Sequence, residues 1–346
     1  DNGSRHSLRV HSQPIISDSY ESRLRDLEPL LLAHQPDSVR KMVRASLAHN
    51  GAVNAGDTGT GKTFEALGSL RVLGRPGFLI GPRIAMSAWK EVAWKHFGTK
   101  LEGFNYERLR LGTQDPVSIV DGKYQWHLSK DTVLIFDEIH RMCNPATLNC
   151  RMGMAALKQG YTVLGLSATM AEGPHQMKFA GTLCRLFAGE HAFPAWAQMN
   201  GTLRKNSRVE FVGGRDVMKR LHEQIFPEHG CRVRIADLGD AFPETQFITQ
   251  AYDIDNPSEA QRIEQEMREE IAYILSREKE DSKKKACVLT TMLRARQRIE
   301  ILKVPAMVEL TQDAVVQGLS VALFVNFDAT VNALLARLGT DCALRG

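Results

Sequence analysis

The sequence of 346 residues lacks any long apolar run. No stretch approaches the ~18 consecutive apolar residues of a membrane-spanning helix, which excludes an integral membrane protein of the helical type. Residues 1–14 also lack the apolar centre of a signal peptide. These absences predict an intracellular protein with no membrane partner, located in the cytoplasm, or in the nucleus or a host cell if its source is eukaryotic or viral.

Cysteine is scarce and scattered, and no two cysteines form a C-x-x-C pair. Without such pairs, a zinc site or a disulfide framework is not predicted, and reduced thiols in the core are expected. Charge of one sign is also not in large excess, because the net charge is only +4. This mildly basic balance permits nucleic-acid binding without requiring it. The six cysteines are Cys143, Cys150, Cys184, Cys231, Cys287 and Cys342.

The clearest motif in the chain lies within residues 54–66, where Gly56, Gly61, Lys62 and Thr63 complete the pattern G-x-x-x-x-G-K-[ST]. Glycines allow consecutive backbone N–H groups to curl around phosphates. The lysine reaches the β- and γ-phosphates, and the Thr63 hydroxyl takes a Mg²⁺ position. A helix beginning near Lys62 would turn its positive end toward the anion. The remaining candidate nucleotide contacts in this loop are Thr58, Gly59 and Thr60.

Short apolar strands alternate with helical segments in the first two hundred residues. Strands are predicted at 51–55, 77–80, 132–136 and 161–166. This alternation indicates a parallel sheet covered by helices on both faces, with its site beyond the carboxyl ends of the strands. The phosphate loop, Asp137-Glu138 and Ser167-Ala168-Thr169 each follow one of these strands, so we expect them to converge on one edge of the sheet.

The acidic pair has a chemical role at such an edge. Asp137 can hold Mg²⁺ together with Thr63, and the adjacent Glu138 is placed to act as general base on the attacking water. Lys62, Asp137 and Glu138 are therefore the candidate catalytic residues. The order of G-D-T-G-T-G-K-T, D-E-I-H and S-A-T resembles that of the superfamily-two helicases and translocases of the DEAD/DEAH type.

Further segments resemble the Snf-type branch of that superfamily. These are the glutamine motif at Gln35, Pro82 with Trp89, Asn105-Tyr106-Glu107, and His140-Arg141 with Asn144. Two segments depart from the Snf pattern. Gly56-Asp57 stands where this branch usually has D-E, and Ser167-Ala168-Thr169 replaces the usual S-G-T. Viral or phage members of the group, and a neighbouring branch, therefore stay open.

The resemblance implies a RecA-like fold, ATP and Mg²⁺ as cofactors, and an ATP hydrolase that moves on nucleic acid, with double-stranded DNA as the expected partner. Gln35 would contact adenine. Ser167, Thr169 and His140 would couple the nucleotide state to a second lobe. An RNA helicase and a non-motor module that binds nucleotide or DNA are the alternatives, and a monomer is favoured.

The predicted organisation has four parts. A tail at 1–24 precedes the first RecA-like lobe at 25–200, a basic and helical connector at 201–300 and an incomplete second lobe at 301–346. The family's arginine motif, Q-x-x-x-R-x-x-R, has no match. In the second half we predict strands at 245–254 and 320–327, helices at 257–280, 292–303 and 329–338, and a charged loop at 277–285. A basic cluster fits either a phosphate-binding surface or a solvated face, and comprises Arg204, Lys205, Arg208, Arg215, Lys219 and Arg220.

Overall fold

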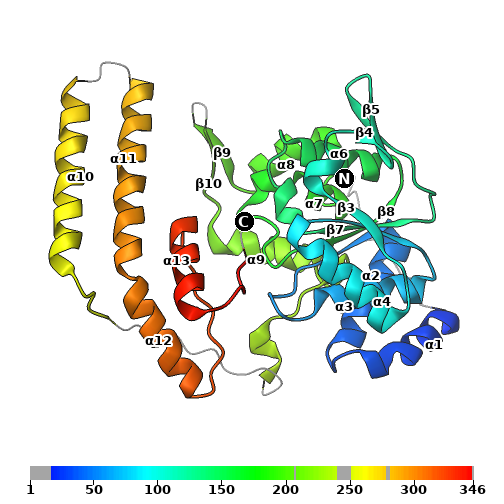
Figure 1. Cartoon of the computed structure of the whole chain (residues 1–346). Coiled ribbons are helices and arrows are strands. Elements are labelled where there is room, and N and C mark those ends of the chain that lie inside the picture. Colours follow the sequence, from blue (N-terminus) through cyan, green and yellow to red (C-terminus); the bar gives the residue numbers. More distant parts are fainter. Residues whose placement is uncertain (1–16, 206–207, 240–250, 278–280, 345–346) are drawn as a thin grey trace. The chain divides into compact units, whose positions relative to one another are not determined.

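The computed structural model describes residues 17–205, 208–239, 251–277 and 281–344 (Figure 1). Its contacts divide the chain into two compact units, Asp1–Glu244 and Thr245–Gly346. This boundary falls inside the segment 201–300 that the sequence predicts to be a connector. No helix in the described ranges is long and apolar enough to cross a membrane.

The first unit contains a six-stranded sheet in the order β11-β1-β8-β7-β2-β3, and all its neighbouring strands pair in parallel. The α/β class predicted from the alternation of strands and helices is confirmed. The strands are β1 (Gly51–Asn54), β2 (Gly77–Gly81), β3 (Glu102–Asn105), β7 (Val133–Asp137), β8 (Thr162–Leu166) and β11 (Gly230–Cys231).

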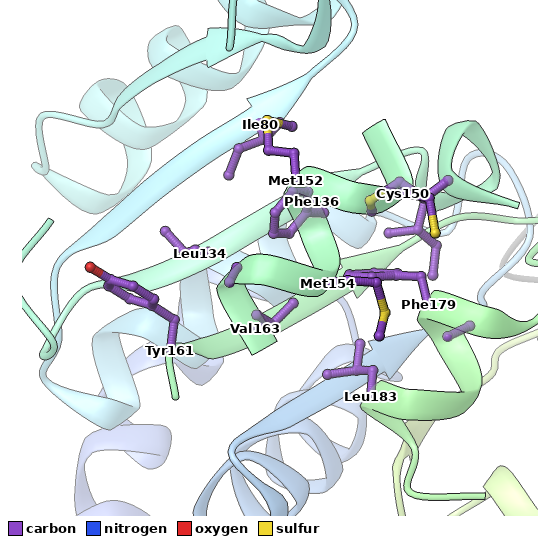
Figure 2. Packing of buried hydrophobic residues seen from close by; sticks show 14 of the residues in the cluster. Ile80, Leu134, Phe136, Cys150, Met152, Met154, Tyr161, Val163, Phe179 and Leu183 are labelled. Carbon is purple, nitrogen blue, oxygen red and sulfur yellow. The ribbon is translucent and has the colours of Figure 1, made fainter. Parts of the chain in front are cut away.

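Side chains of each strand alternate between two apolar clusters, one on each face of the sheet. In β7, Val133 and Ile135 join one cluster, whereas Leu134 and Phe136 join the other. The Phe136 ring lies 5.6 Å from that of Phe179 (Figure 2). Helices α1 (Asp18–Leu27), α2 (Gln35–His49), α3 (Lys62–Leu73) and α4 (Met86–Phe97) cover the first face, and α5 (Tyr106–Leu109), α6 (Leu148–Lys158), α7 (Lys178–Leu183) and α9 (Gly214–Ile225) cover the second.

This two-sided burial explains why the strands read as continuous apolar runs. Each fully buried aliphatic or aromatic side chain contributes about 1.5–3 kcal/mol to folding. Leu24 and Leu27 of α1 are also buried, so the helix begins at Asp18, inside the stretch 1–24 that the sequence predicts to be a tail.

The four strands predicted in the first half are all present, within a residue or two of their predicted bounds. The sequence pattern missed β3 and β11, which are short. It also missed β4 (Thr113–Gln114), β5 (Val117–Val120) and β6 (Lys123–Trp126), which form an antiparallel sheet, and the hairpin of β9 (Thr202–Lys205) and β10 (Arg208–Phe211). A short helix, α8 (Phe193–Met199), precedes that hairpin.

Strand β11 depends on the absence of a side chain at Gly230. This residue pairs with Val53 of β1, and its φ angle is +152°. A Cβ atom there would lie 1.8 Å from the Val53 carbonyl oxygen. Because only glycine fits this close approach, Gly230 permits the chain to return beside the strand that carries the phosphate loop.

The regular elements of the second unit, among its described residues, are the helices α10 (Pro257–Arg277), α11 (Asp281–Leu302), α12 (Val304–Val316) and α13 (Asp328–Leu338). Arg298 of α11 pairs with Glu266 of α10 at 2.8 Å. The helices predicted at 257–280, 292–303 and 329–338 are thus present, but α11 begins at Asp281, so the predicted loop 277–285 is largely helical.

The predicted strand at 320–327 is wrong, because residues 319–327 carry no strand and Phe324 is 93% exposed. A strand needs a hydrogen-bonded neighbour, and no described segment of this unit supplies one. Of the strand predicted at 245–254, residues 245–250 lie outside the described residues, and 251–254 are irregular.

Candidate nucleotide-binding site

Three motifs meet at the carboxyl edge of the sheet, because strand β8 lies between β1 and β7. Leu166, the last residue of β8, is in register with both Asn54 of β1 and Asp137 of β7. The backbone N–H of Ser167 donates to the Asn54 carbonyl at 3.1 Å. The predicted convergence of the phosphate loop, the acidic pair and Ser167 on one edge is confirmed.

The lysine of the phosphate loop is hydrogen-bonded to the backbone of the same loop. Helix α3 begins at Lys62, as predicted, and the φ angles of Gly59 and Gly61 are +92° and +86°. Lys62 Nζ donates to the carbonyl oxygens of Gly56 and Asp57 at 2.9 and 3.0 Å. Its ammonium group therefore lies inside the loop, where phosphate oxygens would be bound.

The threonines of the loop take different positions. The Thr60 hydroxyl is buried and donates to the Asp57 carbonyl at 2.9 Å, so it shapes the loop. Thr58 is exposed at the tip of the loop, whereas Thr63 is partly buried in the first turn of α3. Backbone N–H groups in a first turn have no partner within the helix and are available to an anion.

Gln35 lies against this loop and not out in solvent. Its side chain is 1% exposed; its Oε1 accepts from the Leu32 N–H at 2.9 Å, and its Nε2 donates to the Thr60 carbonyl at 3.2 Å. A Cβ atom on Gly61 would lie 2.1 Å from this Nε2. Gln35 thus ties the start of α2 to the loop, and the adenine contact implied by the resemblance stays a prediction.

Asp137 is held by two aromatic residues. Trp89 Nε1 donates to its Oδ2 at 3.0 Å, and the Tyr106 hydroxyl donates to its backbone carbonyl at 2.8 Å. Burial raises the pKa of the Asp137 carboxyl, and the Trp89 hydrogen bond opposes this effect. Trp89 therefore does more than pack its helix; the sequence pattern gave no signal for this contact, which spans 48 residues.

Glu138, His140 and Ser167 form a hydrogen-bonding cluster. His140 Nδ1 lies 3.0 Å from Glu138 Oε2 and 3.2 Å from Ser167 Oγ. Ser167 Oγ also lies 3.3 Å from Glu138 Oε2 and donates to the Thr169 carbonyl at 2.9 Å. The Glu138 side chain is 39% exposed, so its carboxylate remains accessible to a water molecule.

The backbone at Glu138 is strained, with a φ angle of +57° in the left-handed region. This conformation costs a non-glycine residue about 1–3 kcal/mol and is found preferentially at functional sites. It turns the chain sharply at the end of β7, so that neighbouring side chains face different partners. Asp137 is held by Trp89, while Glu138 reaches His140 and Ser167.

The residues present fit a Mg²⁺–nucleotide complex. Burial raises the pKa of Asp137, and the positive charge of Lys62 on the neighbouring loop opposes this effect. Mg²⁺ commonly uses one or two protein oxygens and completes its shell with phosphates and water, and Thr63 and Asp137 supply that number. Among the described residues no group of three His, Cys, Asp or Glu side chains is arranged to hold a metal ion.

The predicted basic cluster divides between two elements of the first unit. Arg204 lies on β9, and Arg215, Lys219 and Arg220 lie on α9; all four are exposed. Lys205 and Arg208 belong to the same hairpin as Arg204. The exposure of Arg204, Arg215, Lys219 and Arg220 is compatible with a phosphate-binding surface and with a solvated face, so contact of the cluster with phosphates stays a prediction.

The comparison with curated proteins finds a relative that carries a helicase name. The chain is 29% identical over 352 aligned positions to a protein of Acanthamoeba polyphaga mimivirus that is named a putative ATP-dependent RNA helicase. The match covers 91% of this chain but only 64% of the relative.

This similarity to a protein with a helicase name agrees with the order of the motifs in the chain. No family model matches the chain. Two solved structures of the SWI2/SNF2 ATPase core of Sulfolobus solfataricus, one with double-stranded DNA, show TM-scores of 0.44 and 0.41 at 16% and 15% identity. The matches cover 88% of this chain, and 69% and 66% of the chains of the two solved structures.

Proposed function

We propose that this chain carries the ATP site of an ATP-dependent nucleic-acid motor of the superfamily-two type. The observation that carries the proposal is the arrangement at the sheet edge. A complete phosphate loop lies one strand away from the Asp137-Glu138 pair, and Ser167 between them contacts the Glu138 carboxylate. The name of the mimivirus relative supports the same activity.

The mechanism follows from the positions of the side chains. Lys62 would exchange its contacts with the Gly56 and Asp57 carbonyls for phosphate oxygens and neutralise their charge. Thr63 and Asp137 would hold Mg²⁺, which when bound supplies further neutralisation of the phosphates. Glu138, exposed and held at one oxygen by His140, would orient water for in-line attack and accept its proton.

The coupling step is assigned to the cluster around Ser167. Its hydroxyl joins the Glu138 carboxylate to the Thr169 carbonyl, so a change at the γ-phosphate would alter the segment that follows β8. We propose that Ser167, Thr169 and His140 transmit the nucleotide state in this way to the segment that grips nucleic acid. An intracellular setting, where ATP is available, is part of the proposal.

The expected polymer is double-stranded DNA, bound through its phosphate backbone by exposed cations such as those of α9. RNA is the second candidate, since the mimivirus relative is named for RNA. Duplex DNA, single-stranded DNA and RNA can be compared directly for their effect on phosphate release with Mg²⁺–ATP. We expect duplex DNA to stimulate most; greater stimulation by RNA would favour the helicase alternative.

Nucleotide binding must be measured beside phosphate release. A titration with a fluorescent ATP analogue should show binding to the wild-type chain and loss of about 10–100-fold in affinity for Lys62→Ala, because one charge-assisted contact contributes about 1.5–3 kcal/mol. Lys95→Ala, at an exposed ion pair on α4, is the matched control. Absence of ATP binding would overturn the proposal, and binding without turnover on any polymer would favour the non-motor module.

A further inference from the structure

Two polar residues are completely buried beneath the phosphate loop. Asn54 is the last residue of β1 and Glu65 lies in the first turn of α3, and both are 0% exposed. Asn54 Nδ2 donates to Glu65 Oε2 at 2.5 Å. A hydrogen bond between two buried side chains is costly to break, because no water can reach them to replace it.

Asn54 connects this pair to the loop and to the neighbouring strand. Its side-chain Oδ1 accepts from the Gly56 N–H at 3.0 Å, and its backbone carbonyl accepts from the Ser167 N–H. Because Glu65 accepts from the amino end of the Asn54 amide, the oxygen end must face Gly56. A flipped amide would direct its amino group at the N–H of Gly56, where no acceptor exists.

The loop has little room to adopt another path at this point. A Cβ atom on Gly56 would lie 2.7 Å from Thr60 Oγ1 and 3.2 Å from Asn54 Oδ1. A small rotation of the Asn54 side chain would therefore move the first residue of the phosphate loop. Such a shift matters for a site that binds phosphate through fixed backbone N–H groups.

We propose that Glu65 is a positioning residue that orients Asn54 and thereby sets the conformation of the phosphate loop. This inference rests on the proposed nucleotide-binding function and names residues outside the loop motif that control its affinity. Glu65 touches neither nucleotide nor metal in this scheme; it acts through Asn54.

The size and hydrogen bonding of Glu65 identify the conservative substitution. Glutamine has the same shape, carries no charge and keeps an oxygen acceptor for Asn54. Leucine has a similar size but no acceptor, so Glu65→Gln and Glu65→Leu separate the hydrogen bond from the packing.

The test is an equilibrium titration of the 346-residue chain with fluorescent ADP and ATP analogues, which requires no turnover. We expect Glu65→Leu to raise Kd about tenfold, equivalent to about 1.4 kcal/mol. Glu65→Gln should stay within about twofold of wild type. Asn54→Ala, which leaves Glu65 in place, should weaken binding to a similar extent. The double variant Asn54→Ala/Glu65→Leu should be no weaker than Asn54→Ala alone, since both act through one contact.

A control distinguishes positioning from general loss of stability. Leu70→Ala removes a buried side chain from the same helix, away from the Asn54 pair, and should lower the melting temperature without a tenfold change in Kd. Equal binding by wild type and Glu65→Leu would overturn the inference, as would failure of Glu65→Gln to restore affinity or a tenfold loss in Leu70→Ala. If Glu65→Leu does not fold, Asn54→Ala and Glu65→Gln decide the question. Failure of the wild type itself to bind would instead refute the proposed function.

Discussion

The two units of the chain differ in what holds them together. The first unit surrounds its parallel sheet with two apolar clusters, and the ends of its central strands converge on one polar edge. Among the described residues of the second unit only a few are buried, including Ile263, Ala295, Val304 and Leu334. A sheet buried on both faces fixes the position of its strand ends, which is what a site made from several motifs requires. A set of helices with few buried residues gives no comparable constraint.

The largest expected effect of a substitution is at Glu138, at the polar edge of the first unit. Glu138→Gln keeps the size of the side chain but removes the base, so we expect ATP hydrolysis to fall by about 10²–10⁴-fold. The affinity for ATP should stay near wild type, because Glu138 is not placed on the loop. Phosphate release and a nucleotide titration on the same preparation check this. Wild-type turnover would remove Glu138 from the site.

The substitution Gln35→Ala tests how the phosphate loop is held at the edge of the sheet. Gln35→Ala would leave the Leu32 N–H without its acceptor and release the Thr60 carbonyl, so we expect a loss of about 1–3 kcal/mol in stability. Affinity for ATP and GTP should fall together, about tenfold, because the loop itself is loosened. Gln125→Ala, an exposed glutamine on β6, is the control. A loss confined to ATP would show instead that Gln35 contacts adenine.

In the second unit, hydrogen bonds to Glu300 join helix α11 to the segment that precedes α13. The Glu300 carboxylate accepts from the backbone N–H groups of Asn326 and Phe327 at 3.1 and 3.2 Å, which places the chain that enters α13. Burial opposes ionisation of Glu300, but these hydrogen bonds and the one from the Asn326 side chain lower its pKa. The stabilisation is therefore present above the unfolded pKa and is lost as the pH falls through the folded value.

We expect Glu300→Ala to destabilise the second unit by about 2–3 kcal/mol, because it removes hydrogen bonds to a charged acceptor. Hydrogen exchange of α11 to α13 measures the effect, and Glu309→Ala on the exposed face of α12 is the control. Nucleotide affinity should not change. A parallel loss of affinity would contradict the assignment of the ATP site to the first unit alone.

The smallest expected effect concerns His229, beside the start of β11. Burial, together with the charges of His49 and Arg185, lowers the pKa of His229 to about 4. The unfolded state therefore binds a proton more readily between the ordinary value near 6.5 and pH 4, and stability is lost as the pH falls through that window. With allowance for partial exposure, the loss is about 1–2 kcal/mol.

The variant His229→Phe should flatten this part of the stability profile. Thermal unfolding of the wild type and the variant from pH 7 to pH 4 measures the difference, with the exposed His191→Phe as control. The neighbouring groups His49 and Glu228 also face this position and remain in both proteins; His49 Nε2 lies 3.1 Å from Glu228 Oε1. If the stability of His229→Phe falls with pH as steeply as that of the wild type, the pH dependence belongs to His49 and Glu228.

The sequence predicted the edge of the first sheet well because its signals are local. An apolar run followed by Asp137-Glu138, and a glycine-rich loop followed by a helix at Lys62, each specify their own geometry within a few residues. Their convergence then follows from the rules of parallel sheets. The order of the strands, with β8 between β1 and β7, was not predicted and comes from the structure.

Contacts between distant residues were not predictable in this way. The hydrogen bonds of Trp89 to Asp137, Asn54 to Glu65 and Gln35 to Thr60 depend on how helices lie on the sheet. At residues 320–327 the sequence predicted a strand that the structure does not contain. Their apolar, β-branched composition favours a strand, but a strand forms only where another segment accepts its hydrogen bonds, and the described part of the second unit offers none.

The position of β1 in the sheet also bears on the order of folding. Its two neighbours, β8 and β11, come more than a hundred residues later in the chain. The strand that leads into the phosphate loop therefore has no partner while the chain is being synthesised, until residue 166 is available. A nascent chain shorter than this would carry every residue of the loop motif and still lack the frame that shapes it.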